Sequence, residues 1–325
     1  MELRDLFPET FGVMNEIVRR AYLGLISRWP ASWRYVYNWL DQITNFDQRF
    51  ARFRGLKKNL GRLLDRFQPD IVVSTFPAYP YLLEQILGDN RRCKNIAVVT
   101  DSITVNAIWY RSPANYFLVT NEQSAAVVRN SGVASEKIKV FGFPVSPRFA
   151  DFSQDRHLFA LRKARVLYVI NAGRQRAPNL VQTLLDLGIQ LTVTVGRDEK
   201  IRHAVETAAG DRKVQIFGWT DEMPRLLCES DLLIGKAGGA LVQETIAARC
   251  PMIINHVVSG QEEGNAQLIT ETNSGSIALS NDEVIAQVRN CFANSAKRWQ
   301  AWSTNISKIS RPRASLDIAE FLLSI

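Results

Sequence analysis

Cysteine and histidine are scarce in this chain, and their spacing does not suit disulfide or metal chemistry. The 325 residues hold four cysteines and three histidines: Cys93, Cys228, Cys250, Cys291, His157, His203 and His256. Without a C-x-x-C pair or a dense cysteine pattern, the sequence indicates neither a disulfide framework nor a zinc site, as is typical of reduced cytosolic thiols. The histidines lack ligand-like spacing, and we expect them to be surface or structural residues. No D-x-D motif occurs, so we expect no metal site and no metal cofactor.

Long apolar runs are missing as well. No stretch approaches the roughly 18 apolar residues that a membrane-spanning helix needs. The opening MELRDLFPET is charged, so we expect no ordinary signal peptide. Internal repeats and low-complexity tracts are also absent from the sequence. These features predict a protein that is soluble or lies on a membrane surface.

The balance of charge is basic, with 40 Lys and Arg residues against 32 Asp and Glu residues and a net charge of +8. Such an excess favours nucleic acid, an anionic membrane or a phosphorylated substrate as the partner. The sequence contains no recognised nucleic-acid-binding motif, so we expect no nucleic-acid partner.

Aromatic and basic residues gather near the N-terminus. The segment 22–40 mixes tryptophans, tyrosines and arginines, which suits a bilayer interface, and the basic run after it suits anionic headgroups. The alternative is a core helix with exposed aromatics beside a solvated basic face. The candidate membrane contacts are Trp29, Trp33, Arg52, Arg54, Lys57 and Lys58.

Short β-branched runs alternate with helix-like segments in two series. The first series covers 70–76, 95–101, 115–121 and 138–144, and the second covers 165–173, 189–196, 213–219, 231–239, 251–257 and 275–279. This β-α-β alternation predicts two parallel sheets of the α/β class. A chain of this length with 46% hydrophobic residues suits two domains of about 150 residues each. We place them at residues 1–150 and 151–325.

The stretch GKAGGALVQE, residues 235–244, follows a predicted strand and opens a predicted helix. Gly238 and Gly239 allow a phosphate to approach the backbone N–H groups of the first helical turn, which includes Ala240, and the helix dipole favours its charge. Glu244, about one turn further, presents a carboxylate that can accept hydrogen bonds from two ribose hydroxyls. The alternative is a glycine pair that serves only tight packing.

Two further groups of polar residues follow predicted strands, where ligands collect in open α/β sheets. Gln261, Glu262 and Asn265 suit sugar hydroxyls, because amides and carboxylates bond in fixed directions; their alternative is a solvated first helical turn. Asp101 ends the run NIAVVTD and is a candidate general base, with helix capping as the alternative.

The motif order NAG, IFGW, GKAGGALVQE, GQEEGN, preceded by QPDIVVSTFP and VVTDSITVNAIWY, resembles the GT-B glycosyltransferases of the monogalactosyldiacylglycerol synthase and processive diacylglycerol glucosyltransferase family. The resemblance runs from about residue 3 to the low 300s. It implies two Rossmann-like domains that face a cleft. Lipid II-forming N-acetylglucosaminyl transferases share the fold but match these motifs less well.

The resemblance also assigns residues to roles. It places Gly173 in the loop that approaches the diphosphate, Phe217, Gly218 and Trp219 against the uracil, Glu244 on the ribose, Gln261 and Glu262 on the transferred sugar with Asn265 as a weaker contact, and Trp109 on the acceptor side. For Gly173 the alternative is a plain turn glycine, and for the aromatic residues it is a place in the core.

The implied function is transfer of a hexose from UDP-glucose or UDP-galactose to diacylglycerol, with inversion, at the cytoplasmic face of the cell membrane. Family members begin with a strand and a glycine-rich, histidine-containing loop before a DLF-x-E landmark, whereas this chain starts at that landmark. We therefore expect an N-terminal domain without its usual first strand and loop. The alternative function is a catalytically impaired or regulatory UDP-sugar-binding relative.

Overall fold

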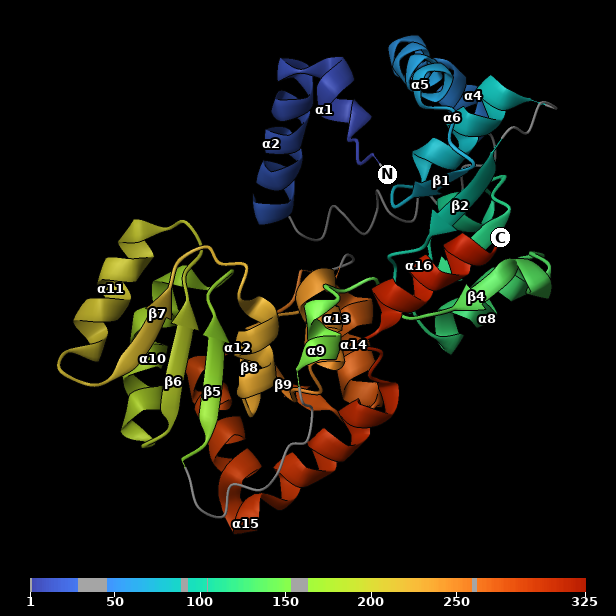
Figure 1. Ribbon diagram of the computed structural model, residues 1–325. Helices are drawn as coiled ribbons and strands as arrows, with labels where there is room; N and C mark the ends of the chain where they lie inside the picture. The colour runs from blue at the N-terminus through green and yellow to red at the C-terminus, as the bar shows by residue number, and fades with distance from the viewer. Residues whose placement is uncertain (1, 29–45, 89–92, 104, 153–162, 259–261) are drawn as a thin grey trace. The chain divides into compact units, whose positions relative to one another are not determined.

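A computed structural model describes residues 2–28, 46–88, 93–103, 105–152, 163–258 and 262–325 (Figure 1). The described residues form two compact units. The first holds residues of Met1–Gly142 together with Val258 and Glu320–Ile325, and the second holds residues of Phe143–Val257 and Glu262–Ala319. The chain thus leaves the first unit after Gly142, somewhat before the predicted boundary at residue 150.

The described part of the first unit contains a four-stranded parallel sheet. Its strands, in spatial as in chain order, are β1 (Ile71–Ser74), β2 (Lys94–Val98), β3 (Tyr116–Val119) and β4 (Ile138–Val140). Its helices are α1 (Leu6–Phe11), α2 (Val13–Arg28), α4 (Phe46–Ala51), α5 (Arg54–Phe67), α6 (Ala78–Leu87), α7 (Ala107–Tyr110) and α8 (Glu122–Asn130), and the 3-10 turn η1 (Ser135–Lys137) precedes β4. All four runs predicted here as strands contain one.

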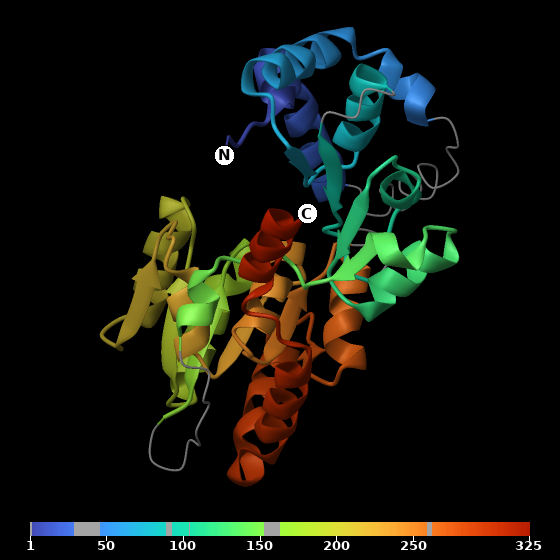
Figure 2. The same ribbon diagram turned by 45° about the vertical axis from the view of Figure 1, so that its right-hand side comes forward.

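Helix α5 shows how its residue pattern positions a helix. Leu56, Leu60 and Leu64 recur every four residues, so they share one face, and all three are buried in a cluster with Leu82 and Leu83 of α6. The opposite face of α5 carries its basic residues. Figure 2 shows α5 and α6 beside the strands of the same unit.

The second unit contains a six-stranded parallel sheet with the order β10-β9-β8-β5-β6-β7. Its strands are β5 (Arg165–Val169), β6 (Gln190–Thr194), β7 (Val214–Phe217), β8 (Leu232–Lys236), β9 (Met252–His256) and β10 (Gly275–Ile277). Its helices are α9 (Arg148–Asp151), η3 (Arg174–Arg176), α10 (Ala177–Asp186), α11 (Glu199–Ala209), α12 (Met223–Glu229), α13 (Gly239–Ala247), α14 (Glu263–Glu271), α15 (Asn281–Ile309, kinked at residues 293–296) and the first part of α16 (Ala314–Ser324).

The strand order of this sheet reverses direction once. After β5 the chain adds β6 and β7 on one side, and it then returns to place β8, β9 and β10 on the other. The strands β5 and β8 are therefore neighbours in the sheet, although 62 residues lie between the end of β5 and the start of β8 in the chain. Such a reversal is a topological switch point, the place where open α/β sheets bind ligands.

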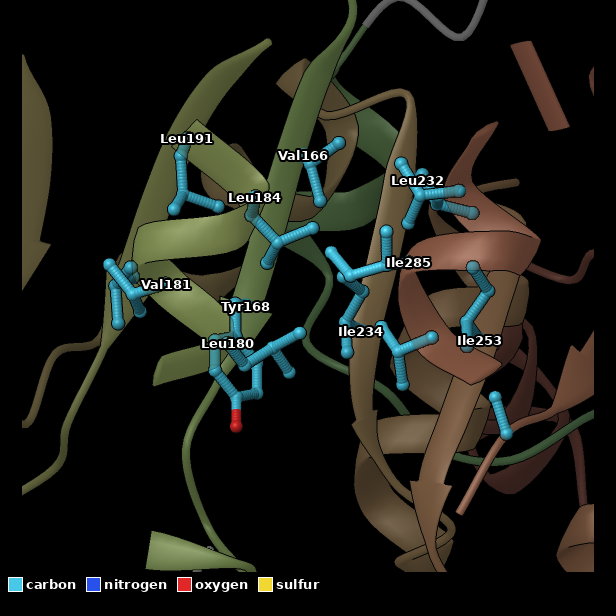
Figure 3. Packing of buried hydrophobic residues seen from close by; sticks show 14 of the residues in the cluster. Val166, Tyr168, Leu180, Val181, Leu184, Leu191, Leu232, Ile234, Ile253 and Ile285 are labelled. Carbon is cyan, nitrogen blue, oxygen red and sulfur yellow. The ribbon is translucent and has the colours of Figure 1, made fainter. Parts of the chain in front are cut away.

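A single apolar cluster supports this sheet from the side of α10 and α15. Figure 3 shows Val166 and Tyr168 of β5, Leu232 and Ile234 of β8 and Leu180 of α10 packed together. All five are fully buried. Parallel strands that helices cover read as continuous apolar runs, which is why both strands were identifiable in the sequence.

Candidate functional site

The switch point of the second sheet brings two glycine-containing loops together. The loop after β5 spans Asn171–Arg176, and the turn after β8 spans Ala237–Gly239. Because β5 and β8 are paired in parallel, both loops leave the same edge of the sheet at adjacent strands. This edge is the candidate functional site of the second unit.

The double-glycine turn opens a nine-residue helix, α13, and leaves its first N–H groups available. Gly238 is the N-cap, with φ −67° and ψ 137°, and within the described residues no side chain caps the helix. Gly239 and Ala240 begin the first turn, and Ala240 is exposed. Uncapped N–H groups and the positive end of a helix dipole favour a phosphate.

An ion pair lies directly beside this turn. The Nζ of Lys236 is 2.6 Å from Oε1 of Glu262, whose side chain is only 6% exposed. A Cβ at Gly238 would lie 3.7 Å from the same Glu262 oxygen. Asn265 donates a hydrogen bond from Nδ2 to the carbonyl oxygen of Ala237 at 3.1 Å. Two of the predicted sugar-contact residues thus reach the glycine turn, while the third, Gln261, lies outside the described residues.

Glu244 is half-buried one turn further along α13. Burial raises the pKa of its carboxyl to about 7. In the part of the chain that the structure describes, no hydrogen bond or ion pair reaches this carboxylate, so nothing offsets the cost of its partial desolvation. A carboxyl in this condition is a functional-site candidate, because a ligand with two hydroxyl donors would supply the missing partners.

We expect the Glu244→Gln variant to be more stable than the natural protein at pH 8. A carboxyl whose pKa is raised by folding lowers stability progressively as pH rises from its unfolded value of about 4.3 toward 7. At about 1.4 kcal/mol per pKa unit, the gain at pH 8 is at most about 4 kcal/mol. Urea unfolding at pH 8 and pH 4 measures it; a gain of equal size at both pH values would contradict the assignment.

Gly173 occupies a position that favours glycine. Its φ of 63° is left-handed, and a Cβ would lie 2.9 Å from Nε of Arg176. Arg174, the next residue, forms an ion pair with Asp198 at 2.9 Å. The glycine therefore does more than end a strand, since it allows the Arg176 side chain to fold back across the loop.

The aromatic residues at the end of β7, Phe217 and Trp219, are not fully buried, so they do not have the core position that was the alternative to a uracil contact. Trp219 is 69% exposed, and the guanidinium carbon of Arg197 lies 5.1 Å from the centre of its ring. Phe217 and Gly218 are half-buried. The strand β7 is the sheet edge, with β6 between it and β5. The segment thus lies at the carboxyl edge of the sheet, and its uracil contact remains a prediction.

In the first unit, Asp101 follows β2 and organises the loop before α7. Its Oδ2 accepts a hydrogen bond from the backbone N–H of Asn106 at 3.1 Å. Asn106 is itself the N-cap of α7 and accepts from the N–H of Ile108. Asp101 therefore supports the residue that caps the helix rather than capping it directly.

Trp109 lies on α7 and is only 3% exposed, packed in a cluster with Val99 and Phe117. Its side chain contributes to the core of the first unit, which was the alternative to an acceptor-side role. The contact between Trp109 and the acceptor stays a prediction, and the burial of this side chain does not support it.

The candidate membrane residues fall into two groups. Arg52, Arg54 and Lys58 are exposed on or just before α5, and Lys57 is half-buried there. Trp29 and Trp33 lie outside the described residues. Within the described ranges, no helix combines the length and apolar character that crossing a bilayer requires.

Sequence reasoning missed two residues at the switch-point edge. His256 ends β9 half-buried, and its carbonyl oxygen accepts a hydrogen bond from the N–H of Ala237. Burial lowers the pKa of His256; Glu262 opposes that effect, and Lys236 adds to it. Arg176 is the second missed residue. The sequence could have indicated His256 only by its position, because it directly follows the strand-like run MIIN.

We expect Glu262→Gln to weaken binding of the site's ligand, while Glu263→Gln leaves it unchanged. Glu262 is buried against Lys236, whereas Glu263 is exposed on α14. Removing the Glu262 charge leaves the ammonium of Lys236, which is 27% exposed, without this partner, so we expect a smaller loss of stability than for a fully buried pair. Thermal melting and UDP titration of both variants measure the two effects, and equal behaviour of the pair would refute a specific role for Glu262.

Known proteins match both units. Residues 1–145 match the family model of monogalactosyldiacylglycerol (MGDG) synthase. Residues 170–314 match that of the glycosyltransferase family 28 C-terminal domain. Together the two matches span most of the chain.

Curated relatives agree with these matches. Processive diacylglycerol beta-glucosyltransferase of Bacillus subtilis is 24% identical over 89% of this chain and 78% of its own. Monogalactosyldiacylglycerol synthase of Spinacia oleracea is 25% identical over 93% of this chain. The chain spans 62% of the length of that plant relative.

Solved structures support the fold. MurG of Acinetobacter baumannii superposes with a TM-score of 0.58 at 15% identity, over 83% of this chain and 79% of its own. UDP-GlcNAc 2-epimerase of Neisseria meningitidis, bound to UDP-GlcNAc, gives 0.59 at 12% identity, over 83% and 81%. The fold is GT-B, with two parallel-sheet α/β domains, and the chain belongs to the family of monogalactosyldiacylglycerol synthases and processive diacylglycerol glucosyltransferases.

Proposed function

We propose that this protein is an inverting hexosyltransferase that transfers glucose or galactose from a UDP-sugar to diacylglycerol. The observation that carries the proposal is the switch-point edge. There the double-glycine turn opens α13, which also carries the half-buried carboxylate of Glu244, and among the described residues no side chain caps the helix and no hydrogen bond or ion pair reaches the carboxylate. The names of the relatives, which are diacylglycerol glycosyltransferases, supply the substrate class.

The donor uses the residues of the second unit. The diphosphate binds the N–H groups of Gly239 and Ala240, and the Gly173 loop approaches it from the neighbouring strand. Glu244 accepts hydrogen bonds from the ribose hydroxyls. Glu262 and Gln261 contact the transferred sugar, with Asn265 as a supporting contact, and the uracil lies against the segment 217–219.

The reaction is one in-line displacement. An acceptor hydroxyl oxygen forms a bond to the anomeric carbon as the bond from that carbon to the UDP oxygen breaks, which inverts the configuration. Asp101 takes the hydroxyl proton as general base. The departing diphosphate gains negative charge, which the N-terminus of α13 and the ammonium of Lys236 stabilise. We propose that no metal cofactor is required, because the sequence has no D-x-D motif.

The acceptor is a membrane lipid, so we propose a peripheral position on an anionic membrane surface at its cytoplasmic face. The exposed cations Arg52, Arg54 and Lys58 favour anionic headgroups. A regulatory UDP-sugar-binding relative and a lipid-linked N-acetylglucosaminyl transferase are not favoured, because the relatives described above are diacylglycerol glycosyltransferases.

The test is an incubation of the protein with vesicles of diacylglycerol and an anionic phospholipid. UDP-glucose, UDP-galactose or UDP-N-acetylglucosamine is supplied separately, with and without EDTA, and lipid products are separated by thin-layer chromatography. We expect a hexosyl lipid from one of the first two donors, at a rate that EDTA does not change. Lipid product from UDP-N-acetylglucosamine alone, or UDP binding without any product, would favour the two alternatives respectively.

A further inference from the structure

Arg176 connects segments that are far apart in the chain. Its guanidinium donates hydrogen bonds from Nη1 to the carbonyl oxygen of Leu279 and from Nη2 to that of Asn255. Leu279 follows β10, and Asn255 lies in β9. We call this set of contacts the Arg176 bridge. It joins the loop after β5 to the opposite half of the sheet.

The bridge spans the switch point. In the strand order β10-β9-β8-β5, the loop after β5 is on one side of the β5–β8 crevice, and β9 and β10 are on the other. The guanidinium therefore links the loop after β5 to β9 and to the segment after β10 across the switch point, where open α/β sheets bind ligands. A backbone hydrogen bond of the sheet itself cannot do this, because the loop lies beyond the paired residues.

Both ends of the bridge are held in place. The carbonyl oxygen of Arg176 accepts a hydrogen bond from Nδ2 of Asn281 at 3.1 Å, and that amide also donates to Asn179 at 3.1 Å. The Tyr168 hydroxyl lies at the edge of the aliphatic cluster in Figure 3. Burial raises the pKa of Tyr168 to about 12, and the nearby positive charge of Arg176 opposes that increase. Arg176 thus sits in a fixed setting rather than on an open surface.

The Arg176 bridge also gives a reason for a glycine at position 173. The Arg176 side chain lies so close to Gly173 that a Cβ there would come within 2.9 Å of Nε. A side chain at position 173 would therefore have to displace the Arg176 guanidinium from its present place. An arginine suits this position better than a lysine, because its planar fork donates to two separate carbonyl oxygens at once.

We propose that Arg176 is a positioning residue of the donor site. It holds the Gly173 loop at the separation from the Gly238–Gly239 turn that a diphosphate needs, without contacting the sugar that is transferred. This inference rests on the proposed function, since it assumes that a nucleoside diphosphate binds between the two loops.

Arg212 provides a matched control in the same unit. It also donates to backbone carbonyl oxygens, from Nε to Ala209 at 3.1 Å, from Nη1 to Gln182 at 3.1 Å and from Nη2 to Ala208 at 2.9 Å. It precedes β7, so it lies toward the amino end of the strands. Its loss removes comparable contacts at the edge of the sheet away from the proposed donor site.

The experiment measures UDP binding by calorimetry for the natural protein, Arg176→Met, Arg176→Lys and Arg212→Met, together with their melting temperatures and donor KM. We expect the Kd for UDP to rise about tenfold in Arg176→Met, less in Arg176→Lys, and not at all in Arg212→Met, although both methionine variants melt earlier. The donor KM should rise in parallel, with kcat for saturating donor little changed.

The outcomes separate this inference from the proposed function. If the natural protein does not bind UDP, the proposed function fails. If it binds UDP and Arg176→Met binds equally well, the positioning role is refuted and the proposed function stands. Equal loss of affinity in the Arg176 and Arg212 variants would reduce the bridge to a general stability effect; should Arg176→Met not fold, Arg176→Lys decides the same comparison.

Discussion

The Glu244→Ala variant is expected to bind UDP about 10- to 100-fold more weakly than the natural protein. The half-buried carboxylate of Glu244 has no hydrogen-bond or ion-pair partner among the described residues, and hydrogen bonds from a ligand to a charged group are worth about 1.5–3 kcal/mol each. Calorimetric titration measures the loss. Exposed Glu263 on the neighbouring helix is the control, and its alanine variant should keep full affinity.

A second ligand locates the effect on the ribose. The natural protein should bind UDP more tightly than 2′-deoxy-UDP, and Glu244→Ala should bind the two alike, because the partner of the missing hydroxyl is gone in both cases. If the variant lost affinity for both ligands but kept their ratio, Glu244 would act somewhere other than the ribose.

The same interaction should depend on pH. Since burial raises the pKa of Glu244 to about 7, the carboxylate that accepts hydrogen bonds from the hydroxyls is progressively protonated as pH falls below 7. UDP affinity should therefore decline toward pH 5.5 more steeply in the natural protein than in Glu244→Gln. Titration of the ligand itself is the same in both proteins and cancels in the comparison.

The Asp101→Asn variant should lose about 10²- to 10⁴-fold in kcat, the usual contribution of a general base. The asparagine oxygen can still accept the hydrogen bond from the N–H of Asn106, so the loop before α7 keeps its support. UDP binding should be unchanged, because the proposed contacts to UDP itself, including Gly239, Ala240 and Glu244, lie in the second unit. Glycolipid formation at saturating donor measures kcat, and calorimetry measures binding.

Asp101→Ala separates chemistry from structure. It removes both the basic group and the acceptor for Asn106, so it should melt earlier than Asp101→Asn while losing a similar factor in kcat. A near-normal kcat in Asp101→Asn would show that another group takes the proton. The exposed Asp70, at the start of β1, offers a control aspartate whose asparagine variant should behave as the natural protein.

The strands and the glycine turn were predictable because their causes are local. Buried parallel strands require short apolar runs, and each predicted run coincides with a strand of one of the two sheets. The turn at Gly238 and Gly239 was predictable for the same reason, since a glycine pair between an apolar run and a helical pattern marks a strand-to-helix turn.

Exposure of the aromatic residues was not predictable in the same way. Trp109 and Trp219 both follow apolar runs, yet the first is buried in the core and the second is mostly exposed beside Arg197. The difference depends on their places in the fold. Trp109 lies on a helix that packs within the first unit, whereas Trp219 follows β7 at an edge of the second sheet, where no further strand covers it.

The residues by themselves determined the α/β class, the two series of strands and the presence of a glycine turn that opens a helix, because backbone preference and apolar periodicity act over a few positions. Only the tertiary structure decided which side chains meet at that turn. Lys236 pairs with Glu262, and Arg176 reaches the carbonyl oxygens of Asn255 and Leu279. Glu244 is partly desolvated, with no partner in the segments that the structure describes. These contacts depend on the order in which strands were added to the sheet, and burial and long-range pairing follow that order rather than the neighbouring sequence.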